Sequence, residues 1–223
     1  MKKKNMFIII SLLLLIVSIM YIVLIKNVDV SAIGPNNSEV GLSTINKSFN
    51  NTFEYNDILY KLTKYLGVIP ILLAVMYALI GLYELKTKKS LFKVDKRLIF
   101  LGVFYVLVLM VYILFEKLTI NYRPVILDGE LEASFPSSHT ILALCFCGSS
   151  ILTSKYFITN KKTRKIIDII SWVVMILIVI GRTLSGVHWL TDIIGGIIIS
   201  GFLLSMFYTV ILILNERKKS SFI

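Results

Sequence analysis

The chain has few residues of the kinds that build disulfide-linked or metal-binding proteins. Its 223 residues include only 2 Cys, 2 His and 4 Pro. Cys145 and Cys147 lie two residues apart in one apolar run, where a helix would direct them to different faces. A disulfide between them would strain that helix, and a CxC metal site would need further ligands. We therefore expect two unpaired cysteines packed among apolar neighbours.

Charged residues are scarce as well. They make up 17% of the chain against 57% hydrophobic residues, and the mean hydropathy is +0.83, which excludes an ordinary soluble domain. Six apolar runs are long enough to cross a bilayer, for which about 20 residues are needed. We predict an all-α, polytopic membrane protein, a bundle of six transmembrane helices. The predicted spans are Met6–Ile25, Leu66–Leu85, Leu98–Phe115, His139–Phe157, Ile166–Gly181 and Trp189–Leu214.

The first apolar run has two possible interpretations. Three lysines at positions 2–4 precede it, and Val30-Ser31-Ala32 resembles a signal-peptidase site. The run is longer than the 7 to about 15 apolar residues usual in a secretory signal. The sequence therefore favours an uncleaved helix, with a cleaved signal as the alternative.

Acidic residues are few, 13 against 24 basic ones. Most of the basic residues lie in four segments: the amino terminus, the stretches 86–97 and 155–165, and the tail 215–219. The positive-inside rule places these segments, and hence both termini, in the cytoplasm. The net charge of +11 then indicates attraction to anionic membrane lipid. A nucleic-acid partner is disfavoured because the basic runs coincide with helix ends and have no aromatic residues interleaved.

The remaining polar segments fall on the opposite, extracytoplasmic face. They are the long loop 27–65, the loop 116–138 and the short turn 182–187. The later part of the first loop, Phe49–Tyr65, mixes aromatic, aliphatic and charged residues, and we expect it to form a short interfacial helix on the membrane surface. Both histidines of the chain also lie on this face.

His188 and Asp192 are four residues apart at the predicted start of the sixth helix, so they would share one helix face. The carboxylate could then accept a hydrogen bond from one imidazole nitrogen and leave the other free to attack. An isolated pair of this kind usually only caps or packs a helix. Here Arg182 lies six residues earlier, across the flexible Gly186, and charged groups near a membrane usually face a cavity or one another.

Arg123 and Arg182 carry planar guanidinium groups that match phosphate oxygens. Either alone could be an interfacial arginine, but together they predict an anion site. Pro136-Ser137-Ser138-His139 opens the fourth predicted helix, and its backbone N–H groups and serine hydroxyls could seat the same anion. Ordinary helix capping by Ser137 or Ser138 is the simpler explanation of the serines.

These residues resemble the signatures of the type 2 phosphatidic acid phosphatase superfamily, the membrane lipid phosphatases related to acid phosphatases and vanadium-dependent haloperoxidases. The family patterns are K-x6-R-P, P-S-G-H and S-R-x5-H-x3-D. The third is matched by Arg182, His188 and Asp192, with Gly181 in place of serine. The second is matched by 136–139, with serine in place of glycine. The first is matched at Arg123-Pro124, but Glu116 occupies the lysine position and Lys117 follows it.

The resemblance implies a reaction and a role for each matched residue. His188, oriented by Asp192, would attack phosphorus to form a phosphohistidine, and His139 would protonate the leaving oxygen. Lys117, Arg123, Ser137, Ser138 and Arg182 would bind the phosphate. No metal or other cofactor is implied, and the nearby acids Asp128, Glu130 and Glu132 show no ligand arrangement. A cation bridging these acids to a head group stays an open alternative.

The resemblance also implies a domain organisation and a class of substrate. We predict one membrane-embedded domain over residues 1–223, with 1–65 as first helix and outer loop and 66–223 as the catalytic helical core. The substrate would be a lipid phosphate or diphosphate: polyprenyl diphosphate, placed first, phosphatidate or phosphatidylglycerol phosphate. Two alternatives remain: a phosphotransferase with the same site, and a non-catalytic transporter or scaffold that binds phospholipid through Arg123 and Arg182.

Overall fold

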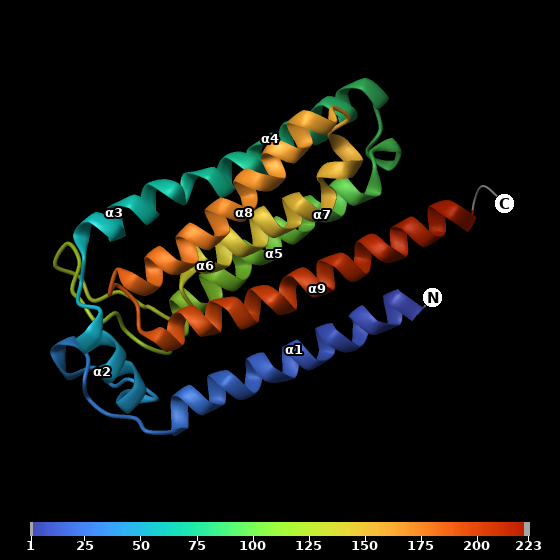
Figure 1. Ribbon diagram of the computed structural model, residues 1–223. Coiled ribbons are helices and arrows are strands. Elements are labelled where there is room, and N and C mark those ends of the chain that lie inside the picture. Colours follow the sequence, from blue (N-terminus) through green and yellow to red (C-terminus); the bar gives the residue numbers. More distant parts are fainter. Residues whose placement is uncertain (1, 221–223) are drawn as a thin grey trace.

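The protein is a bundle of long helices that run nearly parallel to one another (Figure 1). The computed structural model describes the backbone of residues 2–220 and the side chains of residues 2–217. Within that range six helical stretches are long and apolar enough to cross a membrane, and no sheet is present. These are Lys2–Asn27, Asp57–Lys88, Lys96–Lys117, Ser138–Phe157, Lys161–Leu184 and Leu190–Arg217. The all-α fold and the six predicted spans are confirmed, and the protein is a multi-pass membrane protein.

The spans comprise more than six elements because two of them are interrupted. The second span is α3 (Asp57–Leu66) followed by α4 (Val68–Lys88), and the fourth is α6 (Ser138–Leu142), the π-helical turn η3 (Ala143–Cys147) and α7 (Gly148–Phe157). The other spans are α1 (Lys2–Asn27), α5 (Lys96–Lys117), α8 (Lys161–Leu184) and α9 (Leu190–Ser220). Short helices η1 (Pro35–Asn37), α2 (Ser43–Thr52) and η2 (Leu91–Lys93) lie in the connections.

The expectation of a separate interfacial helix over Phe49–Tyr65 is wrong. Its first residues end α2, and its last ones belong to α3, which continues almost in line into α4 (Figure 1). The α3 helix packs against α8 within the bundle. Thr63 is the buried residue of α3, whereas Ile58, Leu62 and Tyr65 are exposed, so most of the apolar side chains point away from the bundle. The segment 57–66 is thus the first part of a long span and not a separate surface helix.

Two packed clusters form the core of the bundle. The larger one joins α1, α4, α5, α6, η3 and α9, and the smaller one lies between α4, η3 and α8. Cys145 belongs to the first cluster and Cys147 to the second, and both are buried and unbonded. The prediction for the cysteines is confirmed, because neighbours two apart on a helix face different partners.

The bundle has two unlike ends. Both termini, η2 and the α7–α8 connection lie at one end, together with the four basic segments of the sequence (Figure 1). The opposite end, which we call the site end, carries residues 28–56, the connection 118–137 and the turn 185–189. The polar residues singled out from the sequence gather at the site end.

Candidate active site

A cavity of about 250 Å³ opens at the site end between α3, α5, α6 and the turn before α9. Both histidines of the chain line it, as do Arg123 and Ser138. Tyr112, Phe115 and Phe135 give one wall an apolar character. The cavity thus combines groups that could hold a phosphate with a wall suited to the lipid part of a substrate.

His188 is not in the sixth span, as the sequence suggested, but in the turn that precedes α9. Its side chain is 3% exposed, and its Nδ1 lies 3.7 Å from Oδ2 of Asp192. This separation is an ion-pair approach and is longer than a hydrogen bond. Neither ring nitrogen has a hydrogen-bond partner among the described residues, so Nε2 is free for chemistry.

The surroundings of His188 favour its neutral form. Burial lowers the pKa of His188 below its ordinary value, and the positive charges of Arg123 and Arg182 lower it further. Asp192 opposes this effect without reversing it. A neutral imidazole is the form that can act as a nucleophile.

Asp192 is fully buried and performs two tasks. It is the third residue of α9, and its Oδ2 accepts a hydrogen bond from the backbone N–H of Trp189 at 3.0 Å, as the acidic residue of a capping box does. Helix capping and histidine orientation, weighed as alternatives from the sequence, therefore occur together. The same carboxylate that starts the helix faces the imidazole.

Arg182, at the end of α8, is 0% exposed, and none of its three guanidinium nitrogens has a hydrogen-bond partner among the described residues. The group lies over the ring of Tyr60 from α3, 5.1 Å from the ring centre. Tyr60 in turn lines the cavity. Buried guanidinium groups are normally hydrogen-bonded, so these unpaired donors indicate a place for an anion.

Arg123 lies on a small hairpin that closes the cavity. Antiparallel bridges join Tyr122 to Ala133 and Leu127 to Glu130, around a turn at 128–129 in which both residues have positive φ. Arg123 Nη2 is 2.9 Å from Glu132 Oε2, whereas its Nε and Nη1 are buried without partners among the described residues. The sequence suggested for Glu132 only the open alternative of a bridging cation, and not this ion pair. The signal that could have found it is the Asp-Gly turn, which pairs the two arms of a hairpin.

His139 lies in the first turn of α6, and its ring packs against the α3–α4 junction. A Cβ atom on Gly67 would lie 3.0 Å from the His139 Cδ2 atom, so only a glycine leaves the ring its present position. His139 Nδ1 is buried without a partner in the described part of the chain. The ring is therefore held by packing, with its nitrogens available to a substrate.

Two phosphate-binding predictions are not supported by the geometry. Lys117 is exposed and does not line the cavity, whereas Glu116 does, because one residue of shift turns a helical side chain by about 100°. Ser137 is 0% exposed, its N–H donates to the Asp192 carbonyl at 3.1 Å, and its hydroxyl accepts from Thr140. Ser137 joins α6 to α9 instead of facing an anion.

Comparisons with known proteins agree with this site. The model of the PAP2 superfamily matches residues 115–216, a segment that contains the hairpin, both histidines and Asp192. Phosphatidylglycerophosphatase B of Bacillus subtilis is 32% identical over 82 residues, which are 36% of this chain and 39% of that protein. The chain thus matches well under half the length of this relative. Over residues 115–216 the chain is therefore similar to the PAP2 superfamily.

A solved structure shares the overall fold. The crystal structure of a transmembrane PAP2 type phosphatidylglycerolphosphate phosphatase from Bacillus subtilis superposes with a TM-score of 0.56 at 20% identity. The match covers 89% of this chain and 94% of that chain. The likeness therefore extends beyond the segment 115–216 that the family model matches.

Proposed function

We propose that this protein is a membrane phosphatase that removes phosphate from a lipid through a phosphohistidine on His188. The observation that carries the proposal is a buried, unpaired Arg182 beside a cavity lined by two histidines. The PAP2 match and the relative that is a phosphatidylglycerophosphatase support the same reaction.

In the proposed reaction, Nε2 of neutral His188 attacks phosphorus while the bond from phosphorus to the lipid oxygen breaks. His139 gives its proton to that oxygen, so the lipid departs as an alcohol. A water molecule then attacks the phosphohistidine, its proton passes to His139, and inorganic phosphate leaves with His188 neutral again. Arg123, Arg182 and the start of α6 at Ser138 would stabilise the charge on the phosphate oxygens.

The charges of the cavity favour a phosphate monoester as substrate. Glu116 and Glu132 line the same cavity as Arg123, and their negative charges would repel the extra charge of a diphosphate. The name of the Bacillus subtilis relative, a phosphatidylglycerophosphatase, is further support, and we put phosphatidylglycerol phosphate ahead of phosphatidate and polyprenyl diphosphate as the substrate. The guanidinium groups supply the positive charge that a metal ion would otherwise bring.

A phosphate-release assay on a panel of lipids tests the function directly. We expect the protein, purified in detergent, to release inorganic phosphate from phosphatidylglycerol phosphate faster than from polyprenyl diphosphate. The rate should be unchanged by EDTA, and the His188→Ala variant, purified in the same way, is the matched control. Activity that disappears with EDTA and returns with magnesium would overturn the metal-free reaction. Transfer of phosphate to an added alcohol in place of water would identify a phosphotransferase.

We also propose that the site end faces the outside of the cell and that both termini are cytoplasmic, because the basic segments share the opposite end. Asp128, at the tip of the hairpin, and Lys161, at the start of α8, are both exposed and lie at opposite ends. A cysteine in place of Asp128 should react with an impermeant thiol reagent in intact cells, and one in place of Lys161 only after lysis. The reverse labelling would move the active site to the cytoplasmic face.

A further inference from the structure

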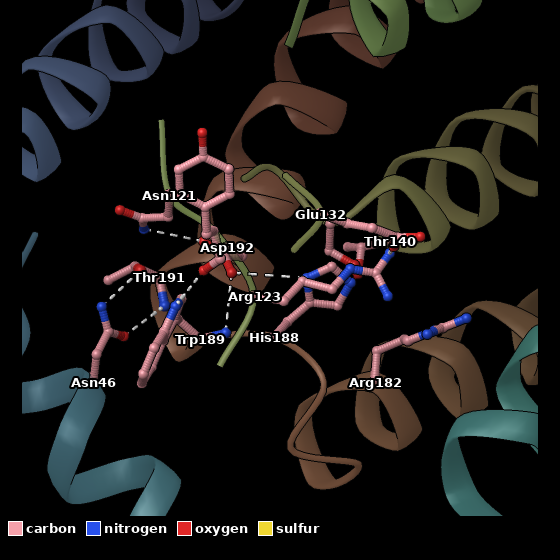
Figure 2. Close-up of polar contacts among 12 residues, drawn as sticks. Asn46, Asn121, Arg123, Glu132, Thr140, Arg182, His188, Trp189, Thr191 and Asp192 are labelled. Carbon is pink, nitrogen blue, oxygen red and sulfur yellow. Dashed lines mark hydrogen bonds and ion pairs between the residues drawn. The ribbon is translucent and has the colours of Figure 1, made fainter. Parts of the chain in front are cut away.

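Two asparagines from outside α9 hold its first turn, where the proposed nucleophile is oriented (Figure 2). Asn121, at the base of the hairpin, donates through Nδ2 to Asp192 Oδ1 at 3.2 Å. Asn46, on α2, donates through Nδ2 to Thr191 Oγ1 at 3.0 Å and accepts from the Thr191 N–H at 3.2 Å.

Both asparagines are fixed by further contacts. Asn46 is 0% and Asn121 is 1% exposed. Gly41 connects them, since its carbonyl accepts from Asn46 Nδ2 at 2.8 Å and its N–H donates to Asn121 Oδ1 at 3.5 Å. A Cβ atom on Gly41 would lie 1.6 Å from the carbonyl oxygen of Ile25, so the backbone at Gly41 packs directly against the end of α1. We call Gly41, Asn46 and Asn121 the asparagine clamp.

The clamp determines which groups contact each oxygen of the Asp192 carboxylate. Oδ1 accepts from Asn121, while Oδ2 accepts from the Trp189 N–H and faces His188 Nδ1. Two hydrogen bonds and the adjacent imidazole leave the carboxylate little freedom to rotate. The two bonds from Asn46 to Thr191 fix the neighbouring residue of the same turn. Asp192 can therefore present Oδ2 to the imidazole only as long as the clamp holds it.

We infer that Asn46 and Asn121 are positioning residues of the active site, acting on His188 through Thr191 and Asp192. The inference rests on the proposed function, in which His188 attacks phosphorus. It extends the catalytic unit to residues 41–46, outside the segment 115–216 that the PAP2 model matches. The first helix and its loop are then part of the phosphatase rather than an attached membrane anchor.

The inference predicts a loss of turnover without a loss of binding. In Asn121→Ala and Asn46→Ala, kcat should fall about 10- to 100-fold, since small misplacement of a reacting group costs this much. KM should stay within about twofold, because neither asparagine lines the cavity. Asn215→Ala is the matched control. Asn215 also bridges two elements, with bonds to Tyr156 and Arg97, but at the other end of the bundle, and its loss should leave kcat unchanged.

A pH profile separates positioning from general damage to the fold. Without Asn121, more of the Asp192 charge acts on His188, so the acid limb of kcat/KM should move to higher pH. The other charged or titratable groups that face His188 keep their places in this variant: Arg123, with Glu132 attached, Arg182 and His139. A variant that is only less stable would lose activity, but the acid limb of its kcat/KM profile would stay at the same pH as in the wild type.

A double variant tests whether Asn121 acts through Asp192. Asn121→Ala combined with Asp192→Asn should be no slower than Asp192→Asn alone, because the same interaction is removed twice. Effects that multiply, or a kcat of Asn121→Ala equal to that of Asn215→Ala, would overturn the inference. Asn46→Ala removes the contacts with Thr191 and Gly41 and leaves the Asn121–Asp192 bond in place, so it gives an independent measurement if Asn121→Ala does not fold. An active His188→Ala variant would instead refute the proposed function, so the two failures are distinguishable.

Discussion

His188→Ala is expected to lose all measurable turnover, together with any covalent phosphate trapped by rapid quenching. The reason is that Nε2 of His188 is the free, neutral nitrogen of the cavity, held by a carboxylate that cannot itself take over the attack. Removing a nucleophile that forms a covalent intermediate typically costs about 10⁶-fold in kcat. The measurement is quench-flow with labelled lipid phosphate on the wild type and the variant.

The same chemistry fixes the direction of the pH dependence. His188 must be neutral to attack, and its pKa lies below the ordinary value because the ring is buried. The proportion of neutral His188 is therefore full at neutral pH and falls only as the pH drops through this lowered pKa. We expect kcat/KM to persist into acid further than a solvent-exposed histidine would allow. An acid limb above the ordinary pKa of histidine would contradict the role of burial.

His139→Ala should show the second largest effect, and one that depends on the leaving group. On an alkyl lipid phosphate the departing oxygen needs a proton, so the loss of the general acid should reduce kcat about 10²- to 10⁴-fold. An aryl phosphate has a leaving group that departs as an anion, and on that substrate the variant should regain much of its activity. The comparison needs both substrates on His139→Ala, with His188→Ala as the variant that neither substrate rescues. Equal losses of His139→Ala on both substrates would remove His139 from the acid role.

The sequence was most informative about the fold where a single physical rule dominates. A membrane span must be a long apolar run with its backbone hydrogen bonds satisfied internally, so hydropathy alone located all six helices. It failed at 49–65, because the amphipathic pattern of α3 does not reveal that this helix continues into α4 and packs on α8. Periodicity shows that a helix has two unlike faces, but not what covers them.

The sequence likewise indicated some residues of the candidate site and not others. His139 and His188 were singled out because the chain has only two histidines, and Arg123 and Arg182 because guanidinium groups match phosphate oxygens. The fold brings all four to one end of the bundle. The sequence could not decide whether Lys117 faces the cavity, because a shift of one residue along α5 changes which side chain lines it. The contacts of Asn46 with Thr191 and of Asn121 with Asp192 span 145 and 71 residues of sequence. No local pattern predicts a pairing at such separation.

The central claim is tested most directly by locating the phosphate in the trapped intermediate. The wild-type protein, mixed with labelled substrate and quenched in base to preserve a phosphoramidate, would be digested and its phosphopeptide sequenced by mass spectrometry. The account predicts a single phosphorylated residue, His188, with a bond that is labile to acid. Phosphate on His139, an acyl phosphate on Asp192 that hydroxylamine cleaves, or turnover with no phosphoenzyme at any quench time would contradict it.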